Sequence, residues 1–431
     1  NVALPSIRQD LGFSESSLVW VVNAYMLTYG GFLLLGGRLG DLYGKRRLFL
    51  GGTALFTLAS AACGLAASQP LLIVARAVQG LGGALVSSIA LSIIMNLFTG
   101  AGERAKAMGI YGFVCAGGGS LGVLLGGGLT RALNWHWVFL VNLPIGAAVI
   151  AMCASLLPRD GARAQGRLDV AGAVLITAAL LFAVYGIVNG PRSLLAVALV
   201  LLALFLVVES RVSHPLAPLR LFRVRSIAVG NVVGALWAAA LFAWFFIAAL
   251  YLQRVLGYDA FQVGLAFLPS NLIMAAFSIG VSAMVVMRFG LRAPIAAGLA
   301  LAASGLGLFA LAPVDGDFWR HVLPGMLLLG IGCGMALNPV MLAVMSDVAP
   351  EESGLASGVA NTAFMMGGAL GLAVLASLAA AEAGAGASLP ALTRGYHLAF
   401  AVGAVFAAAA SALAWLLLRK SPQRSESWAT P

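Results

Sequence analysis

Arg76 is the residue best placed to do chemistry, because it is a lone cation inside a long apolar run, residues 70–98. It lies roughly 9 Å from the start of that run along a helix that rises about 1.5 Å per residue. An arginine at such a depth in a membrane costs at least about 2.5 kcal/mol if it finds no partner. We therefore predict that Arg76 faces the interior of a helix bundle, where Gln79 and Gly80 make the same face polar and small-sided. Snorkelling toward the headgroups is the alternative.

A charged stretch, residues 37–47, forms a second candidate motif between two apolar runs. Asp41 is a lone acid among cations and can accept hydrogen bonds from backbone N–H groups at a neighbouring helix start. The three consecutive cations at 45–47 indicate that this predicted loop lies on the cytoplasmic side. Three glycines permit the tight turn that the loop requires: Gly37, Gly40 and Gly44.

The composition is that of a protein embedded in a membrane. Hydrophobic residues make up 61% of the chain, charged residues only 9%, and the mean hydropathy is +1.00. A net charge of +10 would suggest a nucleic-acid partner in a soluble protein. Here the Lys and Arg residues gather in alternate loops, which is typical of membrane orientation and of attraction to anionic headgroups. We predict membrane lipids as partners and no nucleic acid.

The apolar runs predict an all-α polytopic membrane protein with thirteen complete spans. Thirteen spans would leave the termini on opposite sides, and the chain opens on residues 1–5 without an initiator Met. We expect an N-terminally truncated protein of fourteen transmembrane helices, whose first helix ends at Pro5. The thirteen predicted spans are 18–36, 48–67, 70–98, 105–129, 137–157, 169–189, 193–210, 227–251, 260–286, 294–312, 322–345, 354–381 and 397–418.

No arrangement of residues in the sequence is typical of an enzyme. Paired carboxylates, a Ser/His/Asp set at one membrane depth and a phosphate-binding GxxxxGK[ST] loop are all missing from the sequence. The four cysteines and four histidines stand apart from one another, without metal-ligand spacing. The sequence therefore predicts no enzymatic activity, no cofactor, no metal and no ATP-driven pump.

A weak internal repeat predicts two halves. The loop at 283–292 repeats the first charged stretch, with Gly290 in the place of Gly44, whereas Met287 replaces Asp41. Such repeats are typical of carriers that bind their substrate between two bundles. The predicted domains are an N-terminal six-helix bundle with a truncated first helix (1–157), an inserted helix pair (158–215), a C-terminal six-helix bundle (216–420) and a cytoplasmic tail (421–431).

Three motifs carry a resemblance to a known family. The chain resembles the drug:proton antiporters of the major facilitator superfamily, in the branch with fourteen spanning helices. That family normally has a proline at the position of Val123. Because proline bends a helix, the sequence does not establish a bend at this position. The motifs are Gly37-x-Leu39-x-Asp41-x-x-Gly44-Lys45-Arg46, Leu72-x-x-x-Arg76-x-x-Gln79-Gly80-x-Gly82-x-Ala84, and Gly118-x-x-x-Gly122-Val123-x-x-Gly126-Gly127.

The resemblance implies roles for these residues. Arg76 and Gln79 would serve proton coupling, with an aspartate of the first helix, upstream of Asn1, as the partner of Arg76. Asp169 and Glu209 are the alternative coupling acids, but at cytoplasmic helix ends we expect them to be solvated. A conformational latch would comprise Gly37, Asp41, Gly44, Lys45 and Arg46. A glycine ridge that packs the two halves closely would comprise Gly118, Gly122, Gly126 and Gly127.

The resemblance implies a secondary active transporter of the bacterial plasma (inner) membrane that exports small amphipathic, drug-like compounds in exchange for protons. An importer or facilitator of a small metabolite and a non-transporting membrane sensor remain alternatives, and a periplasmic adaptor remains open. Polar, aromatic and Met side chains in apolar spans are candidates for a broad substrate cavity: Asn23, Tyr25, Trp237, Trp244, Asn271, Asn338, Met341, Asn361 and Phe364.

Overall fold

The structure is a computed structural model, and every regular element in the part of the chain that it describes is a helix. Most of these helices are apolar around their whole circumference, as expected for helices surrounded by lipid and by one another. Within α5, the side chains of Cys115, Val123 and several neighbours lie outside the described residues, as does the side chain of Asp41. The described residues are 2–14, 16–98, 101–158, 160, 169–212, 215–277, 281–348, 353–384 and 388–418.

The helices follow one another with short connections. The first nine are α1 (Leu4–Leu11), α2 (Trp20–Tyr43), α3 (Lys45–Gly64), α4 (Gln69–Leu97), α5 (Ala101–Ala132), α6 (Trp137–Leu140), α7 (Asn142–Leu156), α8 (Val170–Asn189) and α9 (Arg192–Arg211). After the short 3₁₀ helix η2 (Leu219–Arg223) come α10 (Arg225–Arg254), α11 (Ala260–Ala276), α12 (Ser282–Phe289), α13 (Arg292–Phe309), α14 (Leu323–Met345), α15 (Ser353–Ala383) and α16 (Leu389–Leu417).

Eleven helices in the described residues are long and apolar enough to cross a membrane. Each of them coincides with one of the thirteen predicted spans. The other two predicted spans correspond to α5, much of which lies outside the described side chains, and to α11, whose α-helix ends at Ala276 and is shorter than a full span. The membrane-embedded, all-helical class is thus confirmed, whereas the count of fourteen helices is not.

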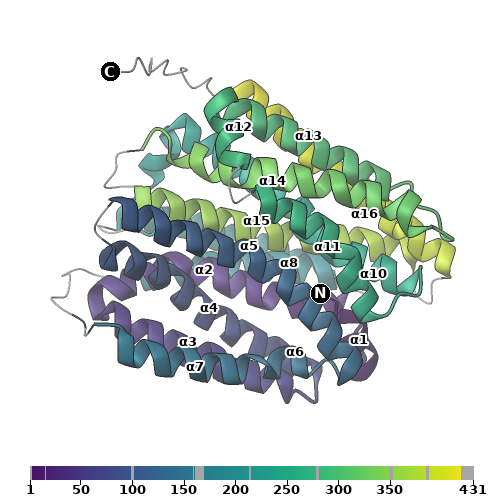
Figure 1. Cartoon of the computed structure of the whole chain (residues 1–431), viewed down its shortest axis with the longest axis horizontal. Coiled ribbons are helices and arrows are strands. Elements are labelled where there is room, and N and C mark those ends of the chain that lie inside the picture. Colours follow the sequence, from purple (N-terminus) through teal and green to yellow (C-terminus); the bar gives the residue numbers. More distant parts are fainter. Residues whose placement is uncertain are drawn as a thin grey trace.

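Two groups of helices lie side by side (Figure 1). In one group α4 packs against α2 and α3, and α7 packs against α3. In the other, α13 packs against α14 and α16, and α10 packs against α15 and α16. The pair α8–α9 packs on itself, and α8 contacts α2 of the first group and α15 of the second. The division into domains at 158 and 215 stays a prediction.

The two groups contact each other mainly through α2 with α15 and α5 with α11. We name the two ends of the bundle by residues that lie there. The Asp259 end carries the last turn of α5 and the start of α11, and the Lys45 end carries the last turn of α2 and the start of α3.

The predicted eleven-residue loop at 37–47 is wrong in extent. Helix α2 continues to Tyr43 and α3 begins at Lys45, so that Gly44 alone, with φ of 104°, separates them. Charged side chains do not interrupt a helix that has left the apolar layer, whereas a positive φ does. Gly290, with φ of 72°, ends α12 in the same way, which confirms the predicted correspondence of Gly290 with Gly44.

Candidate functional site

Arg76 points into the first group of helices, as predicted. Its Nε donates to the carbonyl of Val21 at 2.8 Å, and its Nη1 donates to the Oε1 of Gln79. The Nε2 of Gln79, a buried side chain, donates to the Oγ of Ser60 at 2.7 Å. Arginine and glutamine on α4 are thereby connected to α2 and α3 through one network of hydrogen bonds. This network contains no carboxylate in the part of the chain that the structure describes.

Aromatic rings complete the surroundings of the guanidinium. The Cζ of Arg76 lies 4.5 Å from the ring centre of Tyr25 and 5.7 Å from that of Phe139. Tyr25 in turn stacks on Tyr29, with ring centres 5.7 Å apart. Ring faces attract a cation, and the attraction grows as water is excluded. The half-buried Arg76 is therefore stabilised by carbonyl, amide and ring contacts, and the prediction of an acidic partner stays a prediction.

Gly80 explains how α2 and α4 come this close. A Cβ at Gly80 would lie 2.4 Å from the carbonyl oxygen of Tyr25 and 2.1 Å from the Oγ1 of Thr28. Thr28 also crosses to α4, because its Oγ1 donates to the carbonyl of Ala77 at 2.8 Å. The small-sided face predicted next to Arg76 is thus the contact surface between these two helices.

The predicted cavity residues fall into several environments. Asn23 is fully buried and its Nδ2 donates to the carbonyl of Ala369 at 3.0 Å, which joins α2 to α15. Trp244 packs in an aromatic cluster, 5.4 Å from Phe267 and 6.3 Å from Phe309 between ring centres. Asn23 and Trp244 are therefore already engaged in contacts with other parts of the protein.

The other cavity candidates are also buried or half-buried within the helices. Phe364 is buried edge-on to Phe242 at 5.9 Å between ring centres. Asn361 bonds to the carbonyl of Ser357 within its own helix. Trp237 and Asn271 are buried, and Asn338 and Met341 are half-buried on α14. The indole N–H groups of Trp237 and Trp244 and the Oδ1 of Asn23 are buried without a partner among the described groups.

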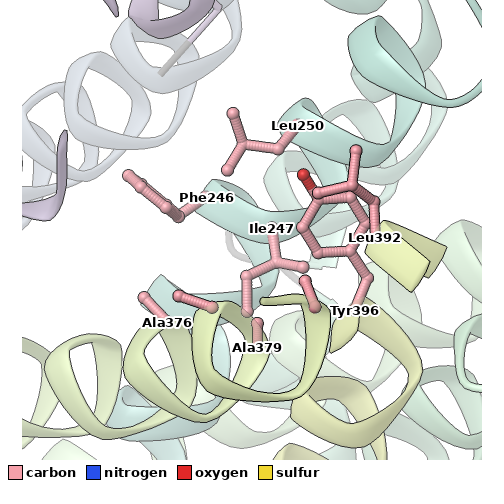
Figure 2. A pocket seen from close by; sticks show the side chains of 9 residues that line it. Phe246, Ile247, Leu250, Ala376, Ala379, Leu392 and Tyr396 are labelled. Carbon is pink, nitrogen blue, oxygen red and sulfur yellow. The ribbon is translucent and has the colours of Figure 1, made fainter. Parts of the chain in front are cut away.

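Figure 2 shows a small apolar cavity within the second group of helices, between α10, α15 and α16. Its volume of about 10 Å³ is at the lower limit for one water molecule, and Phe246, Leu250 and Tyr396 are among its walls. A larger cavity of about 620 Å³ lies at the Asp259 end, with Arg8, Arg131 and Arg254 among its lining residues. Neither cavity is lined by a predicted substrate residue, so the predicted substrate cavity stays a prediction.

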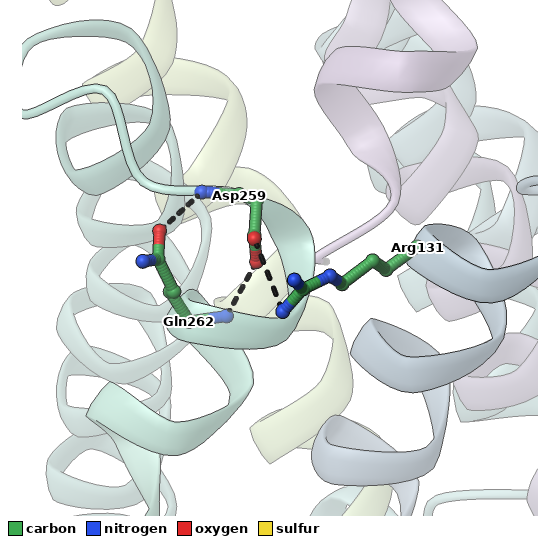
Figure 3. Close-up of polar contacts among 3 residues, drawn as sticks. All are labelled: Arg131, Asp259 and Gln262. Atoms are coloured by element: carbon green, nitrogen blue, oxygen red, sulfur yellow. Dashed lines mark hydrogen bonds and ion pairs between the residues drawn. The ribbon is translucent and has the colours of Figure 1, made fainter.

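The Asp259 end is where the two groups of helices are joined by polar contacts. Figure 3 shows Arg131 at the end of α5 reaching Asp259 at the start of α11, with 3.4 Å between Nη1 and Oδ2. Asp259 also caps α11, because its Oδ1 accepts from the N–H of Gln262 at 2.8 Å. The Nε2 of Gln253 on α10 donates to the carbonyl of Val2 at 3.0 Å.

The glycine ridge on α5 packs at one end only. A Cβ at Gly127 would lie 2.5 Å from the carbonyl oxygen of Ala260, and a Cβ at Gly126 would lie 3.4 Å from Val2. Gly118 and Gly122 are exposed, and no described atom lies within 4 Å of a Cβ at either position. Among the described residues, the ridge is packed at Gly126 and Gly127, because α5 and α11 meet at the Asp259 end. The role of the ridge in packing the two halves stays a prediction.

The start of α3 has an acidic partner that sequence reasoning missed. The Asp160 carboxylate accepts from the backbone N–H groups of Arg46 at 2.8 Å and Arg47 at 3.1 Å. It lies against Gly44, where a Cβ would meet its Oδ2 at 2.4 Å. The Arg46 guanidinium also donates to the carbonyl of Ala154 at the end of α7. The sequence predicted that Asp41 would accept hydrogen bonds from the backbone N–H groups at a helix start. Asp160 does this for α3, and the side chain of Asp41 lies outside the described residues.

The rest of the predicted latch lies along α2 and the start of α3. A Cβ at Gly40 would lie 3.1 Å from Ile89 of α4, whereas Gly37 is less tightly packed, 3.9 Å from Ser88. Lys45 is the first residue of α3. The assignment of these residues to a latch stays a prediction. A signal for Asp160 did exist, because it follows Pro158 at the end of an apolar run on the same predicted side as residues 45–47.

We expect Asp160→Ala to destabilise the protein by about 1 kcal/mol, which is typical of losing a side-chain acceptor at a helix start. The measurement is the melting temperature of the detergent-purified protein. Arg47→Ala is the matched control, because Arg47 offers Asp160 its backbone N–H, which alanine retains. Equal melting temperatures for Asp160→Ala and the unmodified protein would show that the contact contributes nothing to stability.

The apolar helices, packed in two groups with the half-buried Arg76 inside one of them, define a polytopic helical membrane protein. The chain belongs to the major facilitator superfamily, because residues 1–372 and 283–430 match the family of that description. Membership of this family indicates a transporter and not an enzyme.

Relatives match nearly the whole chain. The cephamycin export protein of Amycolatopsis lactamdurans is 41% identical over 96% of this chain and 87% of its own. The puromycin resistance protein of Streptomyces alboniger is 37% identical over 97% of this chain and 87% of its own. Among solved structures, the inward-open xylose transporter of E. coli has a TM-score of 0.66 at 16% identity, over 98% of this chain and 93% of that one. This last likeness shows the shared fold.

Proposed function

We propose that the protein exports small amphipathic, antibiotic-like compounds across the bacterial plasma membrane in exchange for protons. The observation that carries the proposal is the similarity of almost the entire chain to proteins named for cephamycin export and puromycin resistance. Aromatic, Met and amide side chains inside the helices would suit compounds that are partly apolar and carry a few polar groups. Membrane lipids and the exported compound are the partners that this function requires.

Arg76 supports a transporter driven by an ion gradient. Its guanidinium is held by Val21, Gln79 and Tyr25 at a depth where a cation is costly. A fixed positive charge there would favour the ionised form of a nearby acid, so that binding and release of a proton could be linked to movement of the helices. We infer that Arg76 and Gln79 serve proton coupling in this way.

We also infer that the structure corresponds to a state closed to the outside. The predicted orientation, with residues 45–47 in the cytoplasm, places the Asp259 end at the outer surface. The contacts of Arg131 with Asp259 and of Gly127 with Ala260 lie at that end. Alternating access would then require these contacts to open.

Expression of the full-length protein in a bacterial host that lacks its main efflux pumps tests the proposal. We expect a lower accumulation of puromycin and of a fluorescent lipophilic cation, and we expect a protonophore to restore it, because the export would lose its driving gradient. Accumulation that rises on expression would indicate an importer. Lowered accumulation that ignores the protonophore would contradict proton exchange and leave export itself supported.

A further inference from the structure

Two acidic residues at the Lys45 end are buried, against the expectation that they are solvated. Asp169 precedes α8 and is 5% exposed, and Glu209 lies in the last turn of α9 and is 3% exposed. Their positions at helix ends predicted contact with water. The tertiary structure instead buries both, and it brings two acids that are 40 residues apart close together.

The carboxyl groups of Asp169 and Glu209 lie close to each other. Both project over Gly172, where an added Cβ would lie 2.5 Å from the Oδ2 of Asp169 and 3.0 Å from the Oε1 of Glu209. The Oδ1 of Asp169 accepts from the N–H of Gly172 at 2.8 Å and so caps α8. The Oδ2 is buried and has no donor among the described groups.

Glu209 is held in place by backbone donors. Its Oε1 accepts from the N–H of Leu216 at 3.3 Å and its Oε2 accepts from the N–H of Ala217 at 3.2 Å. These two bonds fix the carboxylate at the start of the segment that leads to α10. The side chain therefore has little freedom to turn away from Asp169.

The surroundings supply no ion-pair partner for this pair within the described residues. Neither Asp169 nor Glu209 forms an ion pair there, and α15 carries only Glu382, close to its opposite end. Arg163 and Arg167, which precede Asp169, lie outside the described residues. The charged residues on the other elements packed nearby are Arg38 and Asp41 of α2, Arg211 of α9, and Arg220, Arg223 and Arg225 around η2.

Two ionised carboxylates that are close together and out of water repel each other strongly, and such pairs commonly retain one proton between them. One shared proton turns Asp169 Oδ2 and Glu209 into a donor and an acceptor, so the unpartnered oxygen gains its hydrogen bond. A metal ion is less suitable, because no group of three or more potential ligands occurs among the described residues. We propose that Asp169 and Glu209 form a proton-binding site that holds one proton at neutral pH.

The position of the site allows a change in its charge to affect both halves of the protein. Helix α8, which Asp169 caps, contacts α2 and α15, one of the two helix pairs through which the groups meet. The contact with α2 is tight, because a Cβ at Gly31 would lie 2.0 Å from the Oγ1 of Thr177. A change of charge at Asp169 and Glu209 therefore acts on a helix that is packed against the interface between the halves.

Infrared spectroscopy of the purified full-length protein tests the proposal without any transport assay. We expect a protonated-carboxyl band at neutral pH that shifts in D₂O, and we expect Glu209→Gln and Asp169→Asn each to remove it. Asparagine retains the acceptor that caps α8, so this variant should fold even if Glu209→Gln does not. Glu382→Gln, an exposed acid at the opposite end of the bundle, is the matched control and should leave the band unchanged.

Thermal stability gives a second measurement. As the pH rises and the shared proton leaves, two buried negative charges face each other, so the melting temperature should fall more steeply for the unmodified protein than for Glu209→Gln. A spectrum without the band at neutral pH, or a band that persists in both single variants, would overturn the proposal. Stabilisation by added Na⁺ or Ca²⁺ that Glu209→Gln abolishes, in a protein lacking the band, would identify a cation site instead.

The proton site and the proposed export function can fail separately. Loss of export with an intact infrared band would contradict the function and leave the site standing. Export by a protein that lacks the band would contradict the proton site and leave the export function supported.

Discussion

Replacing Arg76 with alanine should reduce export by about 100-fold or more, because charge-assisted hydrogen bonds are each worth about 1.5–3 kcal/mol and this side chain makes two. The change removes the donor to the Val21 carbonyl and to Gln79, and it takes the cation from the face of Tyr25. Accumulation of a fluorescent lipophilic cation in the pump-deficient host measures the effect. Expression must be matched, because the network also connects α2, α3 and α4.

Arg76→Lys separates charge from geometry. Lysine keeps the positive charge but loses the planar fork that reaches the Val21 carbonyl and Gln79 together. We expect an intermediate loss of export, with the dependence on the proton gradient retained. Export by Arg76→Ala at the level of the unmodified protein would remove Arg76 from the coupling scheme and make it a packing residue.

Replacing Gly127 with alanine should weaken the closure of the Asp259 end by about 1–3 kcal/mol, which is typical of overpacking a close contact. The added methyl group would lie 2.5 Å from the carbonyl oxygen of Ala260, and a backbone atom cannot rotate out of its way. Helices α5 and α11 must therefore separate at this end. The population of the closed arrangement should fall, and export should fall with it.

Gly122→Ala is the matched control for Gly127→Ala, because Gly122 lies on the same helix and no described atom lies within 4 Å of its Cβ position. Thiol labelling of Ala260→Cys, in a background without the native cysteines, measures the opening of the Asp259 end. We expect faster labelling with Gly127→Ala and no change with Gly122→Ala. Identical labelling rates for these two variants would show that the contact of Gly127 with Ala260 does not control closure.

The amino-acid sequence by itself determined where most of the membrane helices lie. Long apolar runs predicted helices such as α10 and α14 because both the length of a span and its hydropathy are properties of a continuous stretch of chain. The correspondence of Gly290 with Gly44 was readable for the same reason, since a positive φ is a local demand that glycine meets. The interior position of Arg76 followed from the cost of a charge in lipid.

Only the tertiary structure decided which residues meet. Asp160 accepts from the start of α3 although it lies 114 residues beyond Arg46, and Asp169 is buried close to Glu209 although both were expected to face water. The glycine spacing on α5 predicted a smooth ridge, yet the packing leaves Gly122 uncovered while Gly127 touches Ala260. Burial, hydrogen bonding and charge proximity depend on the relative placement of distant helices, and the local pattern of apolar and polar residues does not specify that placement.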